Sequence, residues 1–188
     1  MTLYSTPSDL LSGLPDRVAA EITALLPHLR TCRGFAGRLD VKAIKARGLA
    51  APAVLVSRLR LQQGQTRSGP HHSFKVQMAA FILCKDELGL PRDIGAANIA
   101  QALLTLIPEA VWGAPDHIGP AEGLAEEPLV SAESEGLAMA LTAITWDQTI
   151  ALEPWPEPQP ITPALYLGQS PLIGAAHEDD YTLIGGTP

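Results

Sequence analysis

Apolar residues recur at helical spacing in two long stretches of the chain. Residues 14–26 and 93–107 both carry apolar side chains three and four positions apart, as expected of helices with one buried face. Asp93 can cap the second of these helices. A shorter helix is expected at residues 41–47, where Gly48 can end it.

Other stretches alternate between apolar and polar positions, which is typical of strands. Strands are predicted at residues 53–62, 73–85, 129–135 and 136–152, the last two being either separate strands or one strand broken by a turn at residues 134–136. The last is long, and its apolar face shifts midway, which suggests a bulge. Residues 114–128 are rich in Gly, Pro and Glu, which indicates a loop. The end of this segment is also compatible with a short strand.

The order of these elements predicts an α/β (α+β) domain over residues 1–152. We expect an antiparallel or mixed sheet of about four strands with helices packed on one face. Apolar residues make up 46% of the chain, enough for a buried core. After residue 152 the composition changes, because residues 153–188 hold seven prolines, five acids and no Lys or Arg. They predict an acidic, proline-rich, extended C-terminal arm.

The arm contains apolar anchors that a spacer would not need. Trp155, Tyr166 and Tyr181 are therefore candidate contacts with a subunit or partner. Docking on the arm's own domain, docking on a neighbouring subunit and disorder all remain open.

Charge is divided along the chain. Residues 1–92 hold all 13 Lys and Arg and only 6 acids, a formal charge of +7, whereas residues 93–188 hold 14 acids, a charge of −14. The halves can neutralise each other within one copy, or a basic face of one copy can meet an acidic face of the next. Arg58 and Arg60, expected on one strand face, and Arg67 in the loop at residues 63–72 are candidate contacts.

Nothing in the sequence nominates a catalytic residue. The nucleotide-binding, metalloprotease and serine-hydrolase motifs are absent. His71-His72 and the run from His177 to Asp180 contain ligand-type side chains, but neither pattern favours a metal site. Cys32 and Cys84 are expected to be free thiols. The sequence thus predicts a protein that is not an enzyme and has no cofactor.

The same sequence also limits the classes of partner that we expect for this protein. The N-terminus lacks the basic and apolar segments of a secretory signal, and no apolar run approaches the roughly 20 residues that cross a bilayer. Few aromatic residues and an acidic balance argue against sequence-specific nucleic-acid binding. We expect a protein made in the cytoplasm with no membrane partner.

Several segments carry a resemblance to a known family. They are LPDRVAAEITALLPHL, FAGRLD, APAVLVS, FKVQMAAFILCKD, RDIGAANIAQALLTLIPE and ALTAITWDQTIAL. Together, over about residues 12–152, the chain resembles the tail terminator or tail-completion proteins of Mu-like contractile-tailed phages and prophages. The resemblance does not extend to residues 153–188.

The resemblance implies a structural protein of the virion tail or neck, without catalytic residues. Such proteins form a homo-oligomeric ring, a hexamer, at the head-proximal end of the tail. The ring ends tube and sheath polymerisation and joins the tail to the head connector. Two alternatives stay open: another phage adaptor, of the neck or baseplate, and a small metal-dependent enzyme.

Overall fold

The computed structural model describes residues 7–35, 37, 49–64, 72–129, 139–153 and 165–185. The chain divides into two compact units, residues 1–154 and 155–188. The predicted helix at residues 41–47 and most of the predicted strand at 129–135 lie outside the described residues.

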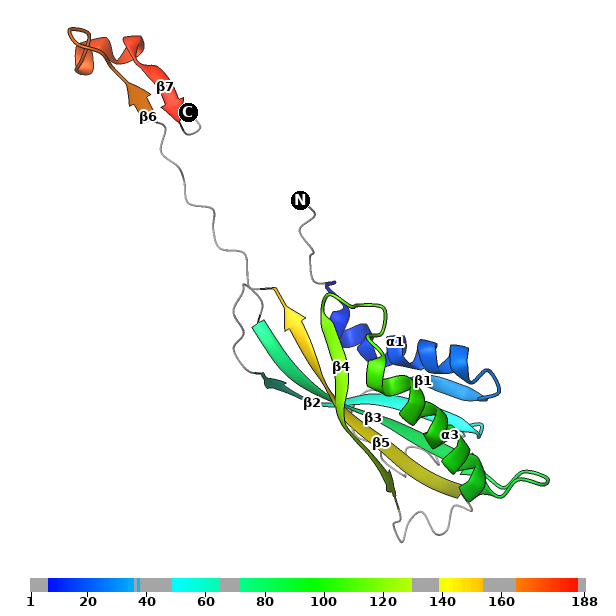
Figure 1. The fold of residues 1–188 in the computed structure, drawn as a ribbon. Coiled ribbons are helices and arrows are strands. Elements are labelled where there is room, and N and C mark those ends of the chain that lie inside the picture. Colours follow the sequence, from blue (N-terminus) through cyan, green and yellow to red (C-terminus); the bar gives the residue numbers. More distant parts are fainter. Residues whose placement is uncertain are drawn as a thin grey trace. The chain divides into compact units, whose positions relative to one another are not determined.

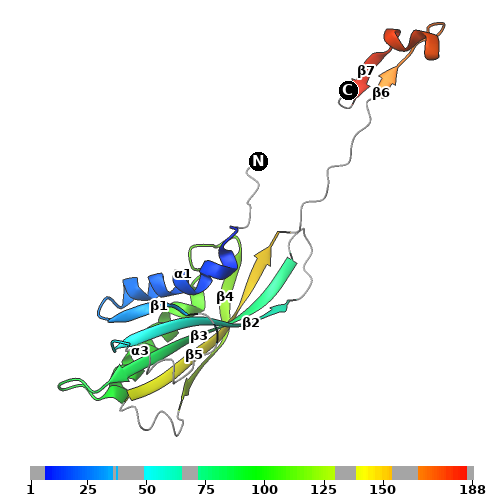
Figure 2. The same ribbon diagram turned by 180° about the vertical axis from the view of Figure 1, so that it is seen from behind.

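The first unit is built on a five-stranded mixed sheet with strand order β1-β2-β3-β5-β4 (Figures 1 and 2). β1 is parallel to β2, and every other neighbouring pair is antiparallel. The strands are β1 (Thr31–Phe35), β2 (Ala53–Gln63), β3 (His72–Lys85), β4 (Ile118–Pro128) and β5 (Met139–Leu152). The predicted mixed α/β fold is confirmed.

Helices α1 (Leu10–Leu25) and α3 (Arg92–Leu106) pack on one face of this sheet, and the 3₁₀ turn η1 (Ile107–Glu109) follows α3 (Figure 1). Both helices bury the apolar faces that their spacing predicts. The main core contains Leu14, Val18 and Ile22 of α1, Val54, Val76 and Ile144 of the sheet, and Ile99 and Leu103 of α3. Each fully buried aliphatic side chain of this kind contributes about 1.5–3 kcal/mol.

The opposite face, which we call the outer face, is apolar only at one end. There a second cluster contains Ala53, Leu55, Ala79, Phe81, Leu83, Leu141 and Ala143. At that end the sheet is therefore buried on both sides. This explains why the apolar pattern of residues 136–152 appears to shift without a bulge in the strand: β5 pairs with β3 continuously from Met139 to Leu152.

The bulges lie in the neighbouring strand instead. β4 carries extra residues relative to β5 between Ile118 and Ala121 and between Glu122 and Ala125. The expected loop at residues 114–128 is thus largely a strand. It was hard to predict because an irregular edge strand rich in Gly, Pro and Glu lacks the usual alternation.

β1 was not predicted at all. It is five residues long, it contains Gly34, and none of its side chains is fully buried. Such a strand owes its existence to pairing with β2 and to the cover of α1 rather than to its own propensity.

The described part of the second unit is a small two-stranded sheet. β6 (Leu165–Leu167) pairs with β7 (Thr182–Gly185), and the 3₁₀ segment η2 (Ala175–Asp180) lies between them. Residues 165–185 therefore form a hairpin within the arm predicted at residues 153–188, and residues 154–164 of that arm lie outside the described part.

Candidate functional site: a charge-divided sheet

Charge is sorted across the sheet by strand. Every Lys and Arg within a described strand of the sheet lies on β1, β2 or β3, and every acid lies on β5 or β4. On the outer face the basic side includes Arg33, Arg60 and Lys75, and the acidic side includes Asp147, Glu122 and Glu127. We call these six residues the charge-divided face.

The boundary of the charge-divided face runs between β3 and β5, and an ion pair bridges it. Lys75 Nζ lies 2.9 Å from Asp147 Oδ2. The hydrogen bond to Asp147, the charge of Asp147 and the charge of Glu122 raise the pKa of Lys75. Among the described residues of this face, the two signs thus pair along the central seam, with basic residues on one flank and acidic residues on the other.

The predicted pairing of Arg58 and Arg60 on one strand face is wrong. Arg58 lies opposite Met78 and Arg60 lies opposite Gln77, so Leu59 is an extra residue in β2. The bulge reverses the alternation at this point. Arg58 consequently lies on the helix face, with Met78, while Arg60 lies on the outer face.

Arg58 has a structural partner on the helix face. Its Nη1 donates a hydrogen bond to the carbonyl of Leu11 in α1, at 3.4 Å. That carbonyl is four residues before Pro15, which lies inside the helix and has no N–H to offer it. Arg58 therefore supplies a donor where the proline removes one.

Both edges of the sheet are protected against the addition of a further strand. At β1, the N–H of Gly34 donates to Asp16 Oδ1 of α1 at 2.9 Å. A Cβ at Gly34 would lie 2.4 Å from the same oxygen, so this close approach requires glycine. At β4, two bulges, Pro120 and three glutamates serve the same purpose. Contacts at these edges must therefore be made by side chains.

Gln148 attaches the acidic edge to the rest of the core. It is 1% exposed, and its Oε1 accepts from the indole N–H groups of Trp112, at 2.6 Å, and Trp146, at 3.0 Å. Its Nε2 donates to the carbonyls of Ala110, at 2.8 Å, and Gly119, at 3.0 Å. One side chain thus joins the turn after η1 and the start of β4 to β5.

Sequence reasoning missed this role of Gln148, although a signal was present. Gln148 lies two residues from Trp146 and two from Ile150, so strand alternation places it at a core position. A polar side chain at such a position predicts buried hydrogen bonds. The sequence alone does not identify the partners.

The other candidate contacts are not brought together. Arg67 and Trp155 lie outside the described residues. Tyr166 is exposed on β6. Tyr181 is used within its own unit, because its hydroxyl accepts from the N–H of Gly174 at 2.6 Å and its ring lies against Gly168.

The thiols are free, as predicted. Burial raises the pKa of Cys32, and burial together with the charge of Glu87 raises the pKa of Cys84 to about 11. A thiol is a poor nucleophile when its pKa is this high.

The predicted run of ligand-type side chains from His177 to Asp180 contains one close pair, with His177 Nδ1 lying 3.2 Å from Asp180 Oδ2. In the described part of the chain, no three His, Cys, Asp or Glu side chains gather as a metal site would require.

Neither comparison with known proteins finds a match: no family model fits the chain, and no curated protein matches it. No helix within the described ranges combines the length and apolar composition needed to cross a membrane.

Proposed function

We propose that this protein is a structural assembly protein that forms a ring of identical subunits and completes a phage tail, as tail terminators do. The observation that carries the proposal is the charge-divided face. A sheet with one basic flank and one acidic flank suits contacts in which one side of a copy meets a different side of the next. Contacts of this kind close into rings when the rotation allows it.

The protected edges favour the same arrangement. Strand addition at an open edge would lead to uncontrolled polymerisation. With the edges blocked by Asp16 and by the bulges of β4, charge complementarity sets the register between copies. The ring is proposed to lie at the head-proximal end of the tail, where it contacts tube, sheath and head-connector proteins. The protein is made in the host cytoplasm and has no catalytic role.

A charge-swap experiment tests the contact. One variant reverses the acidic flank (Glu122→Lys with Glu127→Lys), and a second reverses the basic flank (Arg33→Glu with Arg60→Glu). Both leave the ion pair between Lys75 and Asp147 intact. Each variant alone presents like charges at every contact and should stay monomeric.

An equimolar mixture of the two variants should restore opposite charges at every contact. It should form rings with even subunit numbers, measured by native mass spectrometry at low salt. Association should weaken between about 50 and 500 mM NaCl, because exposed charges are screened over shorter distances. Assembly of either single variant as well as the wild type would contradict the proposed contact, as would a wild-type protein that is monomeric at every concentration.

The position in the particle needs a separate measurement. Cryo-electron microscopy of assembled particles should place the chain as a ring at the head-proximal end of the tail. A location in the neck or in the baseplate would identify it as another adaptor and would overturn the terminator role.

A further inference from the structure

The turn between β3 and α3 presents a fully exposed leucine at its tip. Glu87 and Leu90 exchange backbone hydrogen bonds at 3.1 and 3.0 Å, and Gly89 supplies the positive φ of 83° that closes the turn. Asp86 Oδ1 accepts from the N–H of Arg92 at 3.0 Å and ties the base of the turn to α3. Leu88, at the tip, is 107% exposed. This turn projects from the end of the sheet in Figure 1.

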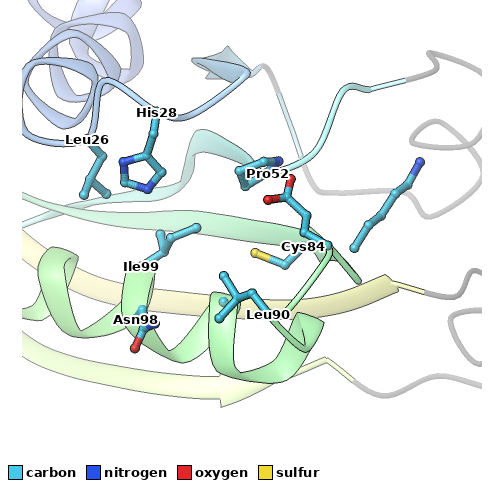
Figure 3. Close-up of a pocket in the computed structure, with 10 residues that line it drawn as sticks. Leu26, His28, Pro52, Cys84, Leu90, Asn98 and Ile99 are labelled. Atoms are coloured by element: carbon cyan, nitrogen blue, oxygen red, sulfur yellow. The ribbon is translucent and has the colours of Figure 1, made fainter.

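An apolar pocket opens beside the turn (Figure 3). Its lining includes the apolar side chains of Leu26, Pro52, Leu90 and Ile99, with Cys84 pointing into it. His28 and Asn98 also line it and are its polar members apart from the charged residues at its edge. Its volume is about 160 Å³. A cavity of about 150 Å³ lined by apolar side chains accepts a benzene molecule, so this pocket has room for one leucine side chain.

The surface around the pocket is also apolar. Three large apolar side chains here are exposed. Leu90 lines the pocket itself, while Leu25 and Ile94 are the chain neighbours of the lining residues Leu26 and Gly95. Single exposed leucines need no explanation, but an exposed apolar group beside an apolar pocket is typical of an interaction site.

The charged residues at the edge of the pocket, which we call its rim, indicate what kind of surface can bind there. Lys85 and Glu87 line the pocket, and Arg30 lies 3.6 Å from Glu87, so both signs of charge occur side by side. A rim of this kind can face a copy of itself with opposite charges opposed. The closed turn holds Leu88 in solvent, outside the pocket of its own chain. A projection and a matching hollow on one surface form a self-complementary, two-fold contact.

We propose that Leu88 of one copy inserts into the pocket of a second copy, and that the second copy's Leu88 enters the pocket of the first. This contact uses the end of the sheet between α1 and α3. It is separate from the charge-divided face and does not depend on the proposed ring.

Cross-linking between two distinguishable copies tests the contact. One copy carries Leu88→Cys and Cys84→Ser, the other keeps Leu88 and Cys84 and carries a different tag, and both carry Cys32→Ser. In a heterodimer of the two tagged copies, a short bis-maleimide can then join only position 88 of one copy to Cys84 of the other. The reaction is run at about pH 8.5 because the raised pKa of Cys84 leaves too little of the reactive thiolate at lower pH. The matched control places the new cysteine at Leu61, an exposed leucine of β2.

The expected result is a covalent heterodimer with Leu88→Cys and none with Leu61→Cys. In sedimentation velocity, Leu88→Ser should weaken self-association by about 100-fold or more, because each dimer of the variant loses two buried leucines, while Leu61→Ser leaves it unchanged. Equal cross-linking at both positions, an unchanged association constant for Leu88→Ser, or a wild-type protein that is monomeric throughout would overturn the proposal. The charge-swap variants should retain the cross-link, so failure of the ring and failure of this contact are distinguishable.

Discussion

Replacing Gln148 with leucine should destabilise the first unit strongly, because four hydrogen bonds depend on this buried side chain. The substitution removes the acceptor shared by Trp112 and Trp146 and the donor to Ala110 and Gly119. A typical intramolecular hydrogen bond contributes about 1 kcal/mol net, and an unsatisfied buried group costs about 1–3 kcal/mol.

Leucine recovers part of this loss by burying apolar surface, so we expect the free energy of unfolding to fall by about 3–5 kcal/mol. Domains of this size are stable by about 5–15 kcal/mol in total. The substitution therefore removes a large share of the stability without filling the site with a larger side chain.

Urea unfolding followed by tryptophan fluorescence measures this change, since Trp112 and Trp146 are both buried beside Gln148. The exchange rate of their indole N–H protons should rise in the same variant. The matched control is Gln101→Leu on the exposed side of α3, which should change the free energy of unfolding by less than about 0.5 kcal/mol. A loss below about 1 kcal/mol for Gln148→Leu, with an unchanged dependence on urea, would refute the claim that this residue holds β4 to the core.

Three further outcomes are expected. Gly34→Ala should lower the free energy of unfolding by about 1–3 kcal/mol in urea titrations, because the new Cβ displaces the Asp16 carboxylate and leaves an edge N–H unpaired; an unchanged midpoint would contradict this. The raised pKa of Lys75 means that its pairing with Asp147 stabilises the fold fully below the unfolded-state pKa of about 10.4 and progressively less above it. Lys75→Met should therefore remove part of the alkaline loss of stability seen in the wild type, and identical profiles would refute the assignment. In a Cys32→Ser background, Cys84 should react with a maleimide at pH 8 at least about 10-fold more slowly than in the urea-unfolded chain, because its pKa is raised to about 11; equal rates by mass spectrometry would exclude a buried thiol.

Local pattern was enough to predict most of the main elements. The helical spacing predicts α1 and α3, and alternation predicts β2, β3 and β5, because each of these elements buries a wide apolar face in the main core. The two edge strands were missed or only partly expected. They have one neighbour each, their side chains are largely exposed, and pairing rather than propensity holds them in place.

The candidate site was predictable in composition but not in geometry. The sequence shows that the basic residues precede the acidic ones. It does not show that an extra residue at Leu59 sends Arg58 toward α1 and Arg60 to the outer face. Nor does it show that Pro15 leaves a carbonyl free for Arg58. A bulge is a property of two paired strands, so one strand's sequence does not reveal it.

The sequence by itself determined the mixed α/β class, the buried helix faces and the separation of charge into a basic half and an acidic half. These follow from spacing and composition, which are local properties of the chain. Only the tertiary structure decided that β1, β2 and β3 stay together on one flank while β5 and β4 form the other, with Lys75 and Asp147 at the seam. Strand order arises from contacts between residues far apart in the chain, and those contacts turn a division along the sequence into a division across a surface.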